Sequence, residues 1–271
     1  MKRLFSIQSQ SETQSDSLIL LCELSHYHFC YAVAEPQTKS ILYLNYYEPD
    51  GLITISQIKQ ALNEDNPDRK SLEKVVISSA FPNMAIVPDA IFKKEQPALF
   101  LNAEDNKIND KIFYDIIKEQ HVVIVYSVPQ VIMDGFDNAS AIETINIYTP
   151  QLKLYNGFAS ADQISVDFTT KEFRVLLKKD QQLQFIQTYP YAAPLDVVYY
   201  LLAICTEHNL SQTETTITLS GLVNEDSALY KELYQYFSNI HFAKPGTSTL
   251  IESSYPQHFF SSMYNLAACV L

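Results

Sequence analysis

The first half of the chain opens with short apolar runs that polar turn residues separate. Three such runs are rich in β-branched and aromatic residues, at 18–24, 28–33 and 41–46. They predict an antiparallel meander of three strands. Thr54, followed three residues later by Gln57, is typical of a helix start, and apolar residues recur after it at helical spacing. The pattern then predicts a strand over 74–79, a helix over 110–120 and a strand over 122–126.

The same order of elements returns in the second half. Three strands are predicted at 164–168, 173–177 and 183–188, and then a helix, strand, helix and strand at 196–208, 216–220, 228–237 and 240–243. Each half is thus predicted as βββαβαβ, a mixed five-stranded sheet flanked by helices in the ribonuclease-H-like arrangement.

Two such units in tandem give the predicted fold class, α/β, two ribonuclease-H-like βββαβαβ units in an actin-like ATPase fold. We expect an N-terminal lead-in over residues 1–17, either frayed or a short edge segment. A first subdomain is predicted over 18–150. A second is predicted over 151–271, and the amphipathic segment 256–271 at its end is predicted as a closing helix.

The net charge of the chain indicates which class of partner to expect. With 31 acidic and 19 basic side chains the formal net charge is −12, so the chain repels a phosphate backbone and nucleic acid is not an expected partner. Apolar residues make up 47% of the chain and charged residues 18%, which is typical of a folded protein. A protein partner of unknown identity is expected.

The chain start and the cysteines bear on the compartment. Met1 to Ile7 has no apolar run of signal-peptide length, and no window reaches the run of about 18 apolar residues that spans a bilayer. We therefore expect a cytoplasmic protein without a membrane span. The four cysteines, Cys22, Cys30, Cys205 and Cys269, are then expected as free thiols.

Several short segments resemble a bacterial family of unknown function. They are Val87–Phe92, Asp196–Leu202, Leu219–Gly221, Leu229–Leu233 and the ending from His258 to Ala267. The family is known in Bacteroidetes and is assigned an actin-like ATPase fold. The resemblance therefore implies this fold, with distant similarity to the PilM- and FtsA-type actin homologues of pilus assembly and cell division, and it implies no activity.

Proteins of this fold bind nucleotide at two phosphate hairpins, one in each half. A hairpin of this kind needs an acid, which orients a metal-bound water, and a glycine, which lets backbone N–H groups approach the phosphates. At the first hairpin this chain has Glu23 and Ser25 but no glycine, and His26 and Tyr27 fill the turn. The first hairpin therefore lacks the expected phosphate-binding pattern.

The second hairpin and the adenosine loop keep more of the pattern. The hairpin has Asp167, Thr169 and Thr170, but Phe168 stands where glycine is needed. The adenosine loop, which is usually glycine-paired, keeps Ser220-Gly221. These polar residues of the two hairpins and the loop are the candidate cleft residues, and ordinary turn roles for them remain open.

This combination leads to two hypotheses about function. The first is a non-catalytic actin-like protein, a pseudo-ATPase without cofactor that acts as an adaptor or scaffold. The alternative is a relative of the pilus-assembly and cell-division actin homologues that binds ATP and Mg²⁺ through unorthodox residues. Melting in the presence of Mg-ATP separates them, because a bound ligand stabilises the folded state.

Two metal chemistries remain as minor options. Cys22, His26, His28 and Cys30 form a cluster, and in a hairpin centred on His26 the two cysteines would share one face of the sheet. Three acids, Asp167, Asp196 and Asp226, fall where a two-metal nuclease of ribonuclease-H type places its ligands, although acids at turns and helix starts are also ordinary caps. For both sets, an ordinary structural role of the residues is preferred to a metal site.

Overall fold

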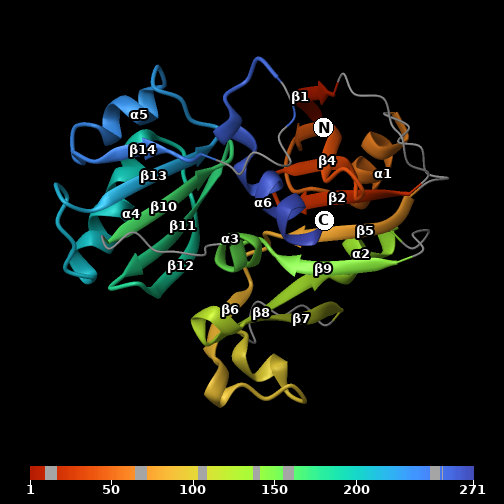
Figure 1. Ribbon diagram of the computed structural model, residues 1–271, viewed down its shortest axis with the longest axis horizontal. Coiled ribbons are helices and arrows are strands. Elements are labelled where there is room, and N and C mark those ends of the chain that lie inside the picture. The colour runs from red at the N-terminus through yellow and green to blue at the C-terminus, as the bar shows by residue number, and fades with distance from the viewer. Residues whose placement is uncertain are drawn as a thin grey trace. The chain divides into compact units, whose positions relative to one another are not determined.

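The computed structural model describes residues 1–9, 17–64, 72–102, 109–136, 141–154, 162–244, 251 and 253–271 (Figure 1). The chain divides into two compact units. Unit 1 contains Met1–Leu154, Gly246–Glu252 and Met263–Leu271, and unit 2 contains Tyr155–Pro245 and Ser253–Ser262. The sequence analysis gives the whole C-terminal segment to the second half, whereas the structure places the part from Met263 onward in unit 1.

Unit 1 is built on a six-stranded mixed sheet, in the order β1-β4-β3-β2-β5-β9. Its strands are β1 (Lys2–Gln8), β2 (Leu18–Leu24), β3 (Phe29–Glu35), β4 (Ser40–Glu48), β5 (Leu72–Ser79) and β9 (Ile142–Asn146). The strands β1, β4, β3 and β2 pair with one another in antiparallel fashion, and β2, β5 and β9 pair in parallel. Every residue of β2 and β3 is buried, which explains why these strands are continuous apolar runs.

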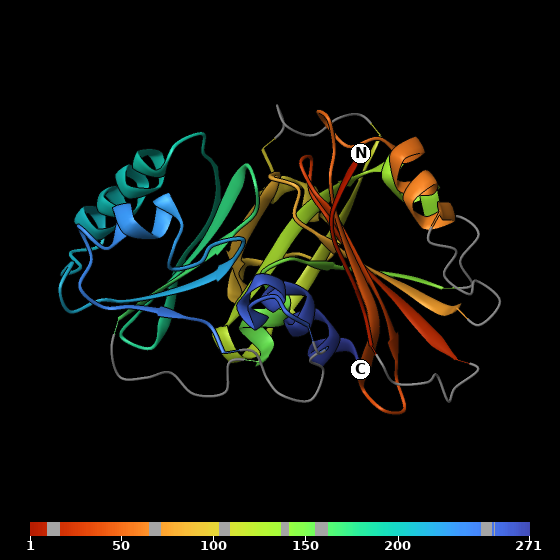
Figure 2. The same ribbon diagram turned by 90° about the horizontal axis from the view of Figure 1, so that it is seen from above.

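The N-terminal lead-in adds a strand to this sheet, and the first helix follows β4 in the chain. The lead-in forms the edge strand β1, and its residues 10–16 lie outside the described residues. Helix α1 (Ile55–Glu64) starts at the predicted cap, where Thr54 N–H donates to Gln57 Oε1 at 3.0 Å and Gln57 N–H donates to Thr54 Oγ1 at 3.4 Å. In Figure 2, α1 and α6 (Ser261–Val270) lie on opposite sides of the six-stranded sheet.

The predicted helix over 110–120 is wrong. The segment forms strand β7 (Asp110–Ile117) and a short 3₁₀ turn, η3 (Lys118–Gln120). With β6 (Met84–Pro88) and β8 (Val122–Pro129), β7 makes a separate three-stranded sheet in the order β6-β8-β7. The strand predicted at 122–126 therefore exists, but it is the centre of this small sheet, and β9 takes the expected place beside β5.

The small sheet is joined to the large one by Asp115 of β7. Its carboxylate accepts hydrogen bonds from Asn146 N–H and from Thr149 Oγ1, both at 2.6 Å, and from Tyr126 OH at 3.3 Å. Burial raises the pKa of Asp115. The remaining short elements of unit 1 are η1 (Asp89–Ile91), η2 (Pro97–Phe100), α2 (Gln130–Met133), η4 (Asp134–Phe136) and α3 (Thr149–Leu154).

Unit 2 follows the sequence prediction closely. Its five-stranded sheet has the order β12-β11-β10-β13-β14, with β10, β13 and β14 parallel. The elements are β10 (Gln163–Phe168), β11 (Glu172–Lys179), β12 (Gln182–Pro190), α4 (Pro194–Glu207), β13 (Thr216–Gly221), α5 (Ala228–Leu233), β14 (Ile240–Phe242) and η5 (Gln257–Phe260). The predicted meander, two helices and two strands are all present.

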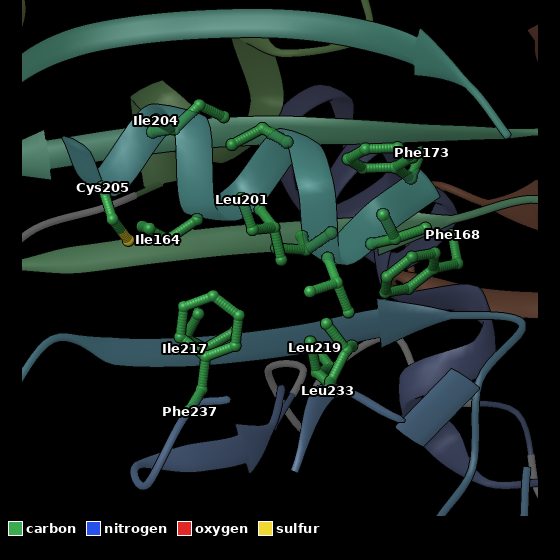
Figure 3. Packing of buried hydrophobic residues seen from close by; sticks show 14 of the residues in the cluster. Ile164, Phe168, Phe173, Leu201, Ile204, Cys205, Ile217, Leu219, Leu233 and Phe237 are labelled. Carbon is green, nitrogen blue, oxygen red and sulfur yellow. The ribbon is translucent and has the colours of Figure 1, made fainter. Parts of the chain in front are cut away.

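Both helices of unit 2 pack on one apolar face of its sheet. Figure 3 shows this core, where Ile164, Phe168 and Phe173 of the first hairpin strands meet Leu201 of α4 and Leu233 of α5. The packing places the ends of β10 and β13, and the turn between β10 and β11, at one end of the sheet. The candidate residues of the second half lie at this end.

Candidate functional site

The turn between β2 and β3 is closed by the hydroxyl of Ser25. The backbone N–H groups of Tyr27 and His28 donate to Ser25 Oγ at 2.9 and 3.2 Å, and Ser25 N–H donates to His28 O at 3.1 Å. Three amides of the turn are therefore used within the turn. A phosphate-binding hairpin would direct such amides at its ligand.

The predicted acid Glu23 is buried and bonds to a histidine of the same hairpin. His28 Nε2 lies 2.9 Å from Glu23 Oε1, and His28 Nδ1 lies 2.8 Å from Ser25 Oγ. Because Ser25 Oγ already accepts two amide protons, its own proton goes to Nδ1, and Nε2–H donates to the Glu23 carboxylate. The imidazole stacks on the ring of Tyr46, with centroids 5.7 Å apart. Sequence reasoning noted His28 as a cluster member and missed it as the partner of Glu23.

The turn between β10 and β11 is closed in the same way by Thr169. The N–H groups of Lys171 and Glu172 donate to Thr169 Oγ1 at 3.4 and 3.0 Å, and Thr169 N–H donates to Glu172 O at 2.9 Å. Thr170 follows in the turn, and its buried hydroxyl has no hydrogen-bond partner among the described residues. The amides of this turn are used internally as well.

Phe168, which stands where a phosphate hairpin needs glycine, does not fill the second turn. Its side chain is 1% exposed and packs in the core, 5.9 Å from the ring of Phe173. The N–H groups of the turn are engaged by the Thr169 hydroxyl and are not blocked by the side chain of Phe168. His26 and Tyr27 of the first turn are each only half-buried, with the His26 ring edge-on to Phe81 at 5.0 Å.

Asp167 of β10 is held by two side chains of neighbouring strands. Its Oδ2 accepts from Arg174 of β11, through Nε at 3.0 Å and through Nη2, and its Oδ1 accepts from Ser220 Oγ of β13 at 2.6 Å. Arg174 is 6% exposed. The structure thus brings together two predicted cleft residues, Asp167 and Ser220, in a polar contact that Arg174 completes.

Gly221, the third candidate in this region, meets a packing requirement. Its φ is +76°, and a Cβ there would lie 2.1 Å from the carbonyl oxygen of Phe168. Directly after β13, Leu222 N–H donates a hydrogen bond to that same oxygen at 2.8 Å. His258 Nε2 then bonds to Val223 O at 2.7 Å and fixes the following loop. Glycine here is explained without a nucleotide.

The two turns are equivalent in register. Leu24 pairs with Phe29 as Phe168 pairs with Phe173, and β5 and β13 run parallel beside them so that Ser78 faces Glu23 as Ser220 faces Asp167. In both halves of the sequence an acid, a large apolar residue and a hydroxyl residue follow one another, and a phenylalanine stands four positions after the hydroxyl residue. This spacing in the two halves of the sequence could have revealed the repeat.

Comparison with known proteins begins with sequence families. The model of a family described as "Protein of unknown function (DUF3822)" matches residues 8–240. The chain belongs to this family. A comparison with curated proteins gives no match.

Solved structures similar to this DUF3822 protein share an actin-like ATPase fold. A Bacteroides thetaiotaomicron protein, described as having an actin-like ATPase fold and unknown function, matches with a TM-score of 0.79 at 18% identity, over 96% of this chain and 100% of that one. A chain of the PilM–PilN type IV pilus biogenesis complex matches with a TM-score of 0.59 at 13% identity, over 94% and 98%. These matches confirm the predicted fold class. No helix in the described part of the chain is long and apolar enough to cross a membrane.

The cysteine–histidine cluster of the DUF3822 protein is not arranged as expected. Cys22 pairs with Tyr31 and Glu23 pairs with Cys30, so Cys22 and Cys30 point to opposite faces of the sheet. The hairpin is centred between His26 and Tyr27, and a shift of half a residue in its centre is enough to separate the cysteines. Burial raises the pKa of the Cys22 thiol.

The acids of the nuclease option have separate structural roles. Asp196 caps α4, since its Oδ2 accepts from Ala192 N–H and Ala193 N–H at 2.9 Å, and these bonds lower its pKa. Asp167 is the partner of Arg174, and Asp226 is exposed. Across the described ranges, no three His, Cys, Asp or Glu side chains are grouped so that they could hold a metal.

Proposed function

We propose that this DUF3822 protein is a cytoplasmic, non-catalytic actin-like protein, a pseudo-ATPase that acts as an adaptor or scaffold for a protein partner. One observation carries the proposal: the hydroxyls of Ser25 and Thr169 occupy, at equivalent positions, the amides that an actin-like phosphate hairpin offers to its ligand. Backbone amides are the main device for stabilising phosphate charge at such a turn.

The acids of the two hairpins support the same proposal. A hydrolytic acid must be available to orient a metal-bound water. Glu23 is instead bonded to His28, and both carboxylate oxygens of Asp167 accept hydrogen bonds from side chains. Binding of Mg-ATP would have to break these contacts at both turns.

The proposal of a protein partner draws on the fold. A chain in the PilM–PilN complex has the same fold over 94% of this chain, and that structure is described as a complex between proteins. A fold of this kind therefore functions within a protein assembly in that case. We extend that role to this chain, with a partner whose identity purification from the native cell would reveal.

The test is binding of Mg-ATP, measured by thermal melting and by calorimetry at millimolar nucleotide. A ligand at about 100 times its dissociation constant stabilises a protein by roughly 2.7 kcal/mol, which a melting scan resolves. We expect no shift in the melting temperature and no heat of binding. A clear shift for the wild-type chain would overturn the proposal and favour the alternative, an ATP-binding actin-like protein.

A matched set of variants tests the reason for the absence of binding. Ser25→Gly with Thr169→Gly frees the amides of both turns, and Ser25→Thr with Thr169→Ser exchanges the two residues but keeps both hydroxyls. The exchange pair should behave as wild type towards nucleotide. The glycine pair should lose about 1–3 kcal/mol of stability at each turn and bind Mg-ATP weakly at most. Binding by the exchange pair would show that the hydroxyls do not block the site.

A further inference from the structure

We propose that the outward side of helix α4 docks an amphipathic helix of a protein partner, one that is apolar on one face and basic beside it. The docking surface is the outer row of α4, which consists of Leu195, Tyr199, Ala203 and Thr206. The helix itself covers one face of the unit 2 sheet (Figure 2). This inference rests on the adaptor role in the proposed function and deepens it, because it names a surface and the chemistry of the partner.

Helix α4 is apolar on both of its sides. Towards the sheet it buries Val197, Val198, Leu201, Ile204 and Cys205. On the other side Leu195 is 58% exposed and Tyr199 is 69% exposed, and Ala203 and Thr206 are exposed as well. A helix that is apolar all round is normally covered all round. The outer row therefore has the composition of a covered surface.

Helix α1 shows what an ordinary surface helix of this chain exposes. It buries Ile58, Ala61 and Leu62 on one side, as α4 does with its own apolar stripe. Its exposed positions are all polar, and they are Ser56, Lys59, Gln60, Asn63 and Glu64. The apolar outer row of α4 is thus a property of that helix and not of the surface helices in general.

The spacing of the outer row favours a helix as the occupant. Leu195, Tyr199 and Ala203 stand four positions apart, so they form a ridge of the kind that packs into the groove of another helix. The row from Leu195 to Thr206 is about 17 Å long, which is three helical turns. The small side chain of Ala203 lets a second backbone approach. Thr206 Oγ1 donates to Leu202 O at 2.9 Å, so covering this hydroxyl leaves no donor unsatisfied.

Tyr199 is held in place before any partner arrives. Its ring lies edge-on to Tyr200 with centroids 5.5 Å apart, and the ring of Tyr200 stacks on Tyr189 of β12 at 4.2 Å. An aromatic side chain that is already ordered loses little freedom on binding. Tyrosines of this kind are enriched among the residues that dominate binding energy at interfaces. Tyr199 is therefore the expected anchor of the surface.

The charges around α4 indicate a basic partner. Residues 180–230 include six acidic residues and no lysine or arginine. Two of these acids, Asp196 and Glu207, lie in the first and last turns of α4. Lys179 reaches the end of the helix, but its Nζ donates to His208 O at 2.7 Å. Lysine or arginine beside the apolar face of a partner helix would be attracted to both ends of the row.

The same charges disfavour the other occupants of an apolar helix face. A second copy of this chain would bring the same acids to the contact, and the net charge of −12 on each copy adds to the repulsion. An anionic lipid surface is repelled for the same reason. A partner protein with a basic amphipathic helix is the occupant that satisfies both the apolar row and its acidic surroundings.

The experiment measures binding of a designed peptide to the full chain by fluorescence anisotropy. The labelled peptide has about 18 residues, with leucines on one helical face and lysines elsewhere. One control peptide has the same composition in an order that gathers no apolar face, and another has glutamate in place of lysine. We expect a Kd below about 0.1 mM for the first peptide and binding at least about tenfold weaker for both controls. Absence of binding, or equal binding of either control, overturns the proposal.

Two tyrosine variants locate the binding. Tyr199→Ser removes the anchor, and Tyr234→Ser is the matched control because Tyr234 is 64% exposed. Tyr234 stacks with Tyr230, which stacks on Phe242 of β14, at the opposite edge of the sheet from β12. Tyr199→Ser should raise the Kd about tenfold or more and Tyr234→Ser should leave it unchanged, with both melting temperatures as in the wild type. Unchanged binding in Tyr199→Ser overturns the proposal.

Further measurements separate this inference from the proposed function and from the other occupants. If a partner purified from the native cell binds Tyr199→Ser as it binds the wild type, the adaptor role stands and the docking surface on α4 is wrong. Binding of Mg-ATP together with loss of peptide binding in Tyr199→Ser would refute the pseudo-ATPase and support the surface. A wild-type dimer in sedimentation that Tyr199→Ser abolishes, or wild-type binding to phosphatidylcholine vesicles that this variant abolishes, would assign the row to a second copy or to lipid and overturn the inference.

Discussion

In the β2–β3 turn the buried acid Glu23 bonds to His28 of its own hairpin, whereas in the β10–β11 turn Asp167 bonds to Arg174 and Ser220 on the two neighbouring strands. The acids therefore have different partners. The turns themselves are nevertheless built alike, because Ser25 and Thr169 accept two amide protons each at the same offset. The comparison shows that closure of the turn depends on the hydroxyl residue and not on how the acid is neutralised.

The strands beside the two turns differ at one position. Ser79 of β5 pairs with Leu24, and Gly221 of β13 pairs with Phe168, in the same parallel register. In both units the next residue donates its N–H to the paired carbonyl at 2.8 Å. Unit 1 accepts a side chain at this point, while in unit 2 the backbone is too close for a Cβ. One glycine is therefore required by packing in one unit only.

The largest expected effect is that of Gly221→Ala. The added Cβ would lie 2.1 Å from Phe168 O at a φ of +76°, so β10 and β13 must separate, and we expect a loss of about 4 kcal/mol in the free energy of unfolding. Ser79→Ala is the matched control. The Ser79 hydroxyl is buried and has no hydrogen-bond partner among the described residues, so its removal should change stability by less than about 1 kcal/mol. Urea unfolding of both variants measures the difference, and equal losses would contradict it.

Asp167→Ala should have the next largest effect. The change removes the carboxylate that the buried Arg174 guanidinium contacts, and loss of one partner of a buried pair costs about 3 kcal/mol. Arg174→Met in the same chain removes the charge as well and should restore most of the stability. Urea unfolding of the single and double variants gives the coupling, and a double variant as unstable as Asp167→Ala would show that the charge is not the cause.

Sequence patterns predicted unit 2 better than unit 1 for a physical reason. The strands of unit 2 are separated by clear turns, and its helices carry one apolar stripe against one sheet. In β7, apolar residues lie on both faces, with Ile112 and Ile116 on one and Phe113 and Ile117 on the other. Spacings of three and four occur in such a strand as they do in a helix, but β-branched and aromatic residues favour the strand.

The sequence names candidate residues but not their contacts. It offers Glu23, Ser25, Asp167 and Thr169 as candidates from their place in two predicted hairpins. The partners His28 and Arg174 depend on strand register, and a register error of half a residue also misplaced the cysteines. The role of the hydroxyls could be read only from amide geometry. Whether the candidate residues bind a ligand stays a prediction.

The smallest expected effect is a pH dependence of stability that comes from the buried ionisable groups, which differ between the two units. Unit 1 holds Asp115, whose pKa burial raises, and unit 2 holds Lys178, whose pKa burial lowers from 10.5 to about 7. In each case burial disfavours the charged form. The effects on stability have opposite dependence on pH, because protonation neutralises the carboxylate and charges the amine. The two groups therefore act in different pH ranges, and that of Lys178 is reached near neutrality.

Lys178→Met tests the unit 2 side of this comparison. Between about pH 7 and pH 10.5 the unfolded chain binds more protons at Lys178 than the folded chain, so the free energy of unfolding of the wild type rises with pH across this window. The variant should lose that rise and gain about 1–2 kcal/mol at pH 7, since methionine fills a similar volume without a charge to desolvate. Lys179→Met is the neighbouring control, because Lys179 Nζ donates a hydrogen bond to His208 O at 2.7 Å, just after the end of α4. Urea unfolding at several pH values measures each slope; an unchanged slope in Lys178→Met, together with a loss of stability, would mean that the buried amine is held charged by its surroundings and that the two units do not differ in this respect.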